Sequence, residues 1–366
     1  MKIAILTQPL YNNYGGILQN YALQTYLRRQ GHETTTVNFA HTPLKLSVPH
    51  FLLSVGKRTL QKILGRDIRY IDPIRQDRET FRVDMHQQRF IATHIRKLDI
   101  HPPLTPEFCD QHHYDAYIVG SDQVWRPFYS PCITNFYLDF AQNSPARKIA
   151  YAASFGVDHW EAKPELTPTL AALAVKFNAI SVRETSGVDL CRQYLNVAAC
   201  HVIDPTMLLS AEDYLQLASS ADTQESHIVS YILDYSPAKK TICESIAGRC
   251  ATPLQRIGIR GKNGYQSIED WLQAIAHARL VVTDSFHGTV FSILFNRPFI
   301  TIANETRGET RLRSLLQMFG LESRLRSENT MRFDRLDTDN DWNDVNTRLE
   351  AYRTKAGIFL DQALKN

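Results

Sequence analysis

Short apolar runs alternate with helical patterns along most of this chain. The runs that we interpret as buried strands span residues 2–6, 34–39, 116–119, 148–153, 201–203, 228–233, 254–259, 280–282 and 299–302. Between several of them, apolar residues recur every three or four positions, as they do from about Ile17 to Arg29. Strands that alternate with helices in this way favour an α/β fold built on parallel sheets.

Breaks in this alternation predict the domain organisation. We expect residues 1–209 to form an N-terminal Rossmann-like domain that ends after the Asp-Pro turn following the strand at 201–203. Within it, residues from about 41 to 110 interrupt the pattern as a helical insertion. Residues 210–335 then form a second, C-terminal Rossmann-like domain, and 336–366 a long helix that packs back across both. A chain of 366 residues is long enough for two such cores.

Composition narrows the functional classes. The formal net charge of +3 is too small to indicate a nucleic-acid partner, and the six cysteines contain no CxxC pair that would support a zinc site. No apolar run is long enough to cross a bilayer, and the N-terminal run reads as a first strand, not as a signal peptide. We therefore expect a cytoplasmic protein.

The insertion is the basic part of the chain. Its cationic residues include Lys57, Arg58, Lys62, Arg66, Arg69, Arg75, Arg78 and Arg82, and they interleave with aliphatic and aromatic residues. A basic amphipathic segment is typical of contact with a membrane surface or an anionic lipid carrier. A solvated helical face that covers the sheet is an equally good interpretation.

The strongest candidate for a binding site is the stretch LVVTDSFHGTVFSILFNR at 280–297. It predicts a buried strand, a polar turn and a helix that begins near Thr289. In a parallel sheet, ligands bind beyond the carboxyl ends of the strands, which places Asp284, Ser285 and His287 in the crevice. Gly288 lets the backbone approach a ligand, and a helix N-terminus suits a phosphate. The alternative is that His287 only caps the helix.

Other strand exits supply further candidates for the same crevice. They are Asn13, Tyr14 and Gln19 near the first strand, Ser121, Asp122, Gln123 and Trp125 after 116–119, Arg183 and Glu184 before a helix, Arg260 and Lys262 after 254–259, and Arg311. The loop at 12–16 lacks a dinucleotide fingerprint, so its amides suit hydroxyl groups better than a pyrophosphate. An arginine at a strand end is able to clamp a carboxylate or phosphate with two hydrogen bonds. Structural roles compete: Gln19 as a helix-surface amide, Asp122 as a cap, Trp125 as core, and Arg183 with Glu184 as a structural pair.

Several motifs together resemble the polysaccharide pyruvyl transferase family. In chain order they are GGILQNYALQ, YIVGSDQVW, YAASFG, SVRE, VIDPT, DSFHGTVFS and the helix that contains Arg311. The resemblance implies two Rossmann-like domains facing each other across a cleft, as in GT-B enzymes. It also implies transfer of pyruvate from phosphoenolpyruvate onto two hydroxyls of one sugar, in bacterial exopolysaccharide or capsular polysaccharide biosynthesis. Arg183 and His287 match the family's donor-binding residues. Ser285 stands where some members have an arginine, so that either another arginine such as Arg311 supplies this charge or the affinity for the donor is lower.

This chemistry needs cations for the donor and a proton donor or acceptor for the reacting groups. Arg183, Arg311 and His287 are the cationic candidates, and general acid or base help comes from Asp122, Glu184 or Asp284. The scheme requires no metal and no cofactor. A polyprenyl-diphosphate-linked oligosaccharide at the inner membrane face is an acceptor that would suit the basic insertion. Two alternatives stay open, a nucleotide-sugar glycosyltransferase on the same fold and a non-catalytic carbohydrate-binding relative.

Overall fold

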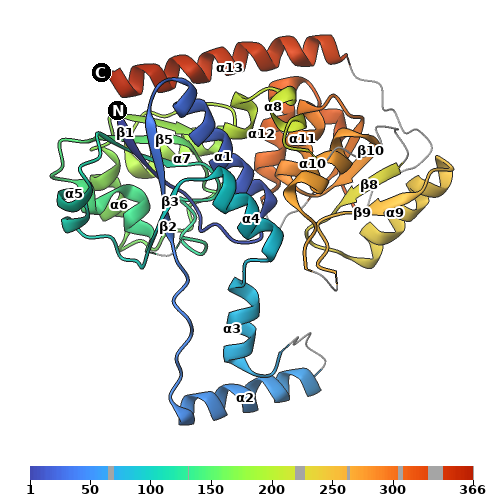
Figure 1. Cartoon of the computed structure of the whole chain (residues 1–366), viewed down its shortest axis with the longest axis horizontal. Helices are drawn as coiled ribbons and strands as arrows, with labels where there is room; N and C mark the ends of the chain where they lie inside the picture. Colours follow the sequence, from blue (N-terminus) through green and yellow to red (C-terminus); the bar gives the residue numbers. More distant parts are fainter. Residues whose placement is uncertain are drawn as a thin grey trace.

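Two parallel sheets organise the computed structural model, which describes residues 1–64, 70–130, 132–218, 227–261, 264–303, 308–328 and 341–365. The first sheet has the strand order β3-β2-β1-β4-β5-β6-β7, and the second has the order β12-β11-β10-β8-β9. Every strand pairing is parallel. The two sheets with their helices lie side by side (Figure 1), which is the arrangement expected of two Rossmann-like domains.

The strands agree closely with the apolar runs. In the first sheet they are β1 (Lys2–Leu6), β2 (Glu33–Phe39), β3 (Lys97–Ile100), β4 (Ala116–Gly120), β5 (Arg147–Ala153), β6 (Ala179–Val182) and β7 (Cys200–His201). In the second they are β8 (His227–Tyr231), β9 (Leu254–Arg256), β10 (Ala278–Thr283), β11 (Phe299–Ile302) and β12 (Leu325–Arg326). Central strands such as β1 and β4 are almost wholly buried, which is why an uninterrupted apolar run marks them.

The helices connect these strands and cover the sheets. They are α1 (Tyr14–Arg29), α2 (Val48–Ile63), α3 (Pro73–Phe81), α4 (Met85–His94), α5 (Glu107–His112), α6 (Thr167–Ala174), α7 (Thr185–Leu190), α8 (Ala211–Leu215), α9 (Pro237–Arg249), α10 (Ile268–Ala276), α11 (Phe286–Leu294), α12 (Glu309–Phe319) and α13 (Trp342–Lys365). Among them, none is both long and apolar enough to cross a membrane.

Two helices begin one turn earlier than the sequence pattern predicts. Helix α11 begins at Phe286 and not near Thr289, because the Ser285 hydroxyl caps it by accepting a hydrogen bond from the Gly288 amide at 3.3 Å. Helix α1 begins at Tyr14, so the glycine pair that suggested a loop lies in its first turn. In both helices the additional first turn is the turn that lies nearest the cleft.

The insertion at 41–110 is not wholly helical. Helices α2, α3 and α4 lie within it, but it also contains β3, the edge strand that pairs with β2. The sequence KLDI carries two charges and is only partly buried, so it lacks the apolar run of a central strand. Helices α2 and α3 project from the body as an arm, which Figure 1 shows in blue below the two domains.

Helix α13 lies across both halves of the molecule (Figure 1). It packs against α12 of the second domain and β5 of the first. The Arg353 guanidinium donates to the carbonyl oxygens of Met207 and Leu209, each at 2.9 Å, and Arg147 donates to the Ala363 carbonyl at 2.6 Å. The Arg353 bonds join the helix to the segment that connects the two sheets, and the Arg147 bond joins it to β5. Helix α13 therefore braces the orientation of the domains.

Candidate active site

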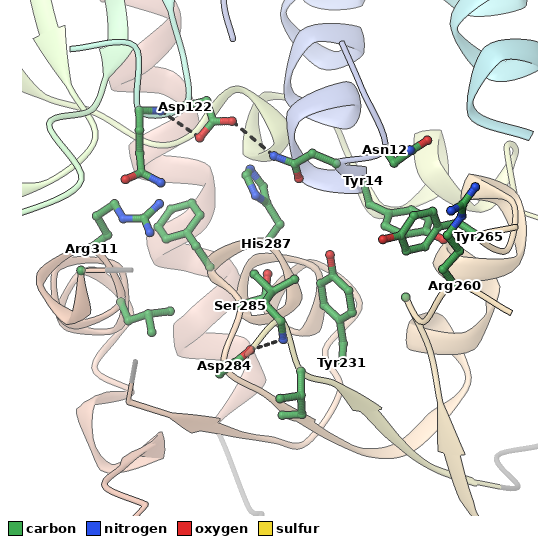
Figure 2. Close-up of a pocket in the computed structure, with 18 of the residues that line it drawn as sticks. Asn12, Tyr14, Asp122, Tyr231, Arg260, Tyr265, Asp284, Ser285, His287 and Arg311 are labelled. Carbon is green, nitrogen blue, oxygen red and sulfur yellow. Dashed lines mark hydrogen bonds between the residues drawn. The ribbon is translucent and has the colours of Figure 1, made fainter. Parts of the chain in front are cut away.

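A cavity of about 540 Å³ lies between the two domains, at the carboxyl ends of their strands. Its lining includes Asn13, Tyr14, Asp122 and Gln123 from the first domain, and Tyr231, Arg260, Asp284, Ser285, His287 and Arg311 from the second. Figure 2 shows Asp122 on one side of this space, with His287 and Ser285 opposite. Parallel sheets bind their ligands beyond the carboxyl ends of the strands, and the cavity lies at this position for both sheets.

A buried ionic cluster lies at one wall of the cavity and is centred on Asp204. The Arg183 Nη1 donates to Asp204 Oδ2 at 2.7 Å, and the Ser121 hydroxyl donates to the same oxygen at 3.0 Å. His287 Nε2 lies 3.7 Å from that oxygen. The opposite carboxylate oxygen accepts hydrogen bonds from the amide and the hydroxyl of Thr206. One carboxylate therefore orients Arg183 just after β6, Ser121 just after β4 and His287 in α11.

The charge state of Asp204 follows from these contacts. Burial raises the pKa of its carboxyl, but the adjacent His287 ring and Arg183 guanidinium outweigh burial and hold that pKa well below its ordinary value. The carboxylate is thus ionised in the folded protein. From the sequence alone, Asp204 in VIDPT is predicted only as part of an Asp-Pro turn. Its signal was a carboxylate at a strand exit, the same signal that singled out Asp122.

Arg183 is almost fully buried, with 2% of its surface exposed. Its guanidinium carbon lies 4.4 Å from the ring centre of Phe286, and Nη2 lies 3.8 Å from Asp122 Oδ1. Within the described ranges, neither Nε nor Nη2 has a hydrogen-bond partner. Phe286 lines the cavity and Arg183 lies behind it. The guanidinium therefore keeps unused donors directly under the cavity wall.

His287 is held in place by the first domain. A β-carbon on Gly15 would come within 1.9 Å of His287 Nδ1, so only glycine permits this approach of α1 to α11. The imidazole Nε2 is buried, and it too has no hydrogen-bond partner among the residues described. The histidine thus sits at the junction of the domains, between Gly15 and Asp204.

Glu184 and Arg311 complete the buried wall. Glu184 Oε1 accepts hydrogen bonds from the Ser154 hydroxyl and from the amides of Phe155 and Gly156, and burial raises the pKa of this carboxyl. Arg311 lines the cavity from α12, 5.8 Å from the Phe286 ring centre. Burial, together with the charge of Arg183, lowers the Arg311 pKa to about 10. Two guanidinium groups therefore flank one phenyl ring.

Other predicted residues lie near the cavity with their polar groups already engaged. The Asp284 carboxylate accepts from Lys239 Nζ at 2.8 Å and from the amides of Leu233 and Asp234. Arg260 reaches Asp84 at 3.2 Å at the far end of the cavity. The Tyr14 hydroxyl donates to the Gln266 carbonyl at 2.7 Å, which ties the two domains together.

Six predicted residues stand outside the cavity lining, and a seventh is not described. Arg183, Glu184 and Ser121 lie behind the lining in the buried wall, and the other three are Trp125, Gln19 and Gly288. Trp125 stacks on Tyr137 with ring centres 5.0 Å apart and donates from its indole to the Phe136 carbonyl, so it is a core residue and not a platform for a sugar. Gln19 is fully buried, not on the helix surface, and its amide donates to the Thr7 hydroxyl. Gly288 lies in the first turn of α11, and its amide is used by the Ser285 cap. Lys262 lies outside the described residues.

A sequence model of the polysaccharide pyruvyl transferase family matches residues 13–306. The chain belongs to this family. The match spans the Asn13 loop, the Asp204 cluster and the His287 turn, so every part of the ionic cluster lies inside the family region. A search of curated proteins finds no significant match.

Solved structures with a similar fold include two sugar-transferring enzymes. One is a UGT transferase from Siraitia grosvenorii in complex with UDP, with 10% identity and a TM-score of 0.45 over 99% of this chain and 95% of that one. Another is the E. coli heptosyltransferase WaaC with ADP, with 12% identity and a TM-score of 0.39 over 96% of this chain and all of the other.

The polysaccharide pyruvyl transferase fold here contains a second cavity beside the first. It has a volume of about 720 Å³ and shares Asn13, Asp122 and Gln123 with the cavity between the domains. The remainder of its lining includes five aromatic residues, which are Tyr11, Phe39, Phe81, Phe128 and Tyr129. None of them is among the residues that the sequence analysis predicts for the site. Asp122 thus faces both cavities of this transferase, and it adopts an unusual positive φ of 65°.

Proposed function

We propose that this protein transfers a pyruvate unit from phosphoenolpyruvate to two hydroxyls of one sugar, forming a ketal and releasing phosphate. One observation carries the proposal. Arg183 Nε and Nη2 and His287 Nε2 are buried at the cavity wall, and none has a hydrogen-bond partner in the described part of the chain. Buried donors are normally satisfied, so unused donors at one wall suit an anion with several acceptor oxygens.

Phosphoenolpyruvate has the required charges, because a carboxylate and a phosphate are attached to the same carbon of one small molecule. Arg183 and Arg311 flank Phe286 from two elements, which provides two cations for two anionic groups. His287 is a third donor, and Asp204 fixes its position and that of Arg183. For the phosphate to reach Arg183, the Phe286 ring has to turn aside. Donor binding therefore includes a rotation of this one side chain.

The proposed reaction begins when a general acid adds a proton to the methylene carbon of phosphoenolpyruvate. The enol carbon becomes electrophilic, and a sugar hydroxyl attacks it and gives up its proton to a base, which replaces the proton spent in the first step. The bond from that carbon to the phosphate oxygen then breaks, and the phosphate stays held in the site. The second hydroxyl attacks the same carbon and passes its proton to this phosphate, which closes the ketal ring and releases hydrogen phosphate. His287 and the arginines stabilise the charge on the departing phosphate.

Among the three carboxylates considered as general base, Asp122 is placed best. The Asp284 carboxylate is held by Lys239 and two amides, and one Glu184 oxygen is held by a hydroxyl and two amides. Glu184 also does not line the cavity. Asp122 Oδ1 accepts from the Gln123 amide at 2.8 Å, but within the described part of the chain Oδ2 has no closer polar contact than Asn13 Nδ2 at 3.5 Å. Because Asp122 lines both cavities, it lies between a donor in one and an acceptor in the other.

The aromatic cavity is the proposed acceptor site. Sugar rings present apolar faces of C–H groups, and the aromatic rings of Tyr11 and of the exposed Phe128 provide matching surfaces. Gln123 and Asn13, shared with the first cavity, offer amide groups for sugar hydroxyls. Acceptor and donor would then meet at Asp122.

The test is phosphate release from phosphoenolpyruvate with a panel of sugar acceptors, followed by mass spectrometry of the product. A product heavier by one pyruvate ketal supports the proposal. Thermal protection separates the alternatives, because a ligand that binds only the folded state raises the melting temperature. Protection by phosphoenolpyruvate is expected; protection by a nucleoside diphosphate alone, with turnover of a nucleotide sugar, would instead establish a glycosyltransferase. A protein that binds sugar without turning over either donor would be the non-catalytic relative.

A further inference from the structure

The arm formed by α2 and α3 exposes an apolar surface that nothing in the described structure covers. Six large aliphatic side chains on α2 and its C-terminal end are each between 57% and 76% exposed: Val48, Leu52, Leu53, Leu60, Ile63 and Leu64. Their spacing of three, four and seven residues, with two adjacent pairs, places them on one side of the helix. We name these six residues the α2 apolar face.

The opposite side of α2 is the one that meets the rest of the arm. Phe51, Val55 and Thr59 are partly buried there, and α2 packs against α3. The Arg58 guanidinium donates to the Tyr70 carbonyl at 3.3 Å and also contacts the Gln76 side chain. The orientation of α2 is therefore fixed by its inner side, and the α2 apolar face points outward.

All the charged residues in α2 and in the segment that leads into it are cationic. Residues 41–64 contain Lys45, Lys57, Arg58 and Lys62 and no aspartate or glutamate. Two copies of so basic a helix would repel each other, whereas a surface rich in anionic lipid would attract it. An amphipathic helix with cations beside a leucine-rich face binds in the plane of a bilayer interface.

The arm also connects this face to the proposed acceptor cavity. Figure 1 shows α2 at the far end of the arm, with α3 running from it toward the body. Phe81, the last residue of α3, lines the aromatic cavity, and Glu79 lines the cavity between the domains. The nine residues of α3 span about 13 Å, so a sugar held on a lipid diphosphate would have only a short distance to cover.

We propose that the α2 apolar face docks on an anionic membrane surface and positions the enzyme for an acceptor carried by a membrane lipid. The docking is inferred from the structure of the arm alone, whereas the lipid-borne acceptor rests on the proposed transferase function. Insertion of the six aliphatic side chains supplies the apolar contribution, and Lys57 and Lys62 supply electrostatic attraction.

Vesicle flotation of the full chain tests the docking without any donor or acceptor. The vesicles contain phosphatidylcholine alone or with about a quarter phosphatidylglycerol. We expect binding to the mixed vesicles that is about tenfold tighter than to phosphatidylcholine and weaker at high salt. Leu52→Ser with Leu60→Ser and Ile63→Ser should reduce it at least about tenfold, as should Lys57→Gln with Lys62→Gln.

A matched control replaces exposed aliphatic residues far from the arm, Val175→Ser with Ile358→Ser, and should bind as the unchanged protein does. Circular dichroism and melting temperature confirm that each variant folds. Absence of vesicle binding by the unchanged protein, or equal binding by the triple serine variant, would overturn the proposal. So would a dimer in sedimentation that the triple variant dissociates while neither protein binds vesicles, because the face would then join two copies.

Activity separates the docking from the chemistry. With a water-soluble sugar acceptor, the triple serine variant should release phosphate at the rate of the unchanged protein. With the acceptor embedded in mixed vesicles, its rate should fall about tenfold. Equal rates on both acceptors would refute the positioning role even if vesicle binding were lost. A protein that binds vesicles but turns over no acceptor would leave the docking intact and remove the transferase proposal.

Discussion

Gly15 at the start of α1 lies directly against the imidazole of His287 at the start of α11. The approach is so close that a β-carbon on Gly15 would lie 1.9 Å from Nδ1 and 2.2 Å from Cγ of the ring. This contact between the two domains holds the imidazole of His287 beside Asp204. The first domain thus fixes the position of a proposed donor-binding group that belongs to the second.

We predict that Gly15→Ala impairs donor use more than folding. The methyl group has to push the imidazole away from Asp204 or widen the cleft, and a misplacement of about 1 Å at a reacting group can cost up to about 100-fold in rate. The expected result is a fall in kcat/KM for phosphoenolpyruvate of about tenfold or more. Gly248→Ala is the matched control, because a β-carbon there meets nothing within 4 Å and α9 should gain slightly in stability. Full activity in Gly15→Ala would contradict this prediction, because it would show that displacing the imidazole does not lower kcat/KM.

Asp204→Asn should weaken donor binding although Asp204 does not line the cavity. Asparagine accepts with only one oxygen and has no charge, so Arg183 and His287 lose the group that orients them. Loss of such a supporting group typically costs 10- to 100-fold, and we expect that loss in kcat/KM, mainly through KM. The exposed Asp344→Asn, which disturbs only a surface pair with Arg348, serves as control. An unchanged KM would show that Arg183 keeps its position without Asp204.

Where one strand exit carries several polar residues, the sequence correctly indicates residues that line the cavity. Asp122 and His287 lie in such clusters, and both line the cavity. The order of apolar runs also predicted the two parallel sheets, because a strand buried on both faces leaves an uninterrupted apolar run. The charged edge strand β3 gave no such run and was missed.

The sequence does not show which polar groups pair with each other in the folded protein. Asp284 resembles Asp122 in its position after a strand, yet Lys239, 45 residues away, engages its carboxylate. Trp125 follows Asp122 by three residues but turns into the core against Tyr137. The aromatic lining of the second cavity comes from segments as distant as Tyr11 and Phe128. Such pairings depend on the tertiary fold, and no local pattern records them.

Asp122 and Asp284, which the sequence does not distinguish, should respond differently to the same substitution. Asp122→Asn is expected to lower kcat by about 100- to 10,000-fold, because it removes the proposed base, while phosphoenolpyruvate still raises the melting temperature. Asp284→Asn leaves Lys239 as an uncompensated buried charge and should cost about 3–5 kcal/mol of unfolding free energy. Denaturant titration beside steady-state kinetics distinguishes the two. A stable and fully active Asp122→Asn variant would remove Asp122 from the mechanism.

A pH-dependent contact at the domain connection gives a separate test of the fold. The Arg29 guanidinium at the end of α1 donates to both oxygens of Asp213 in α8, at 3.0 and 2.6 Å, and this bond lowers the Asp213 pKa to about 2. Because the folded pKa is below the ordinary value of 3.8, the stabilisation is present above that value and is lost as the pH falls toward 2.

Arg29→Gln removes this contact but leaves the Ser210 capping box of α8 intact. Arg29 is half exposed, so solvent screening limits the expected loss to about 1 kcal/mol at pH 7. Urea unfolding at a series of pH values should show the two proteins converging below about pH 4, as Asp213 takes up its proton. Arg348→Gln, at an exposed pair within one helix, should show a smaller difference at pH 7. If the Arg29 difference persisted unchanged to pH 2.5, the arginine would be acting through packing and not through the Asp213 carboxylate.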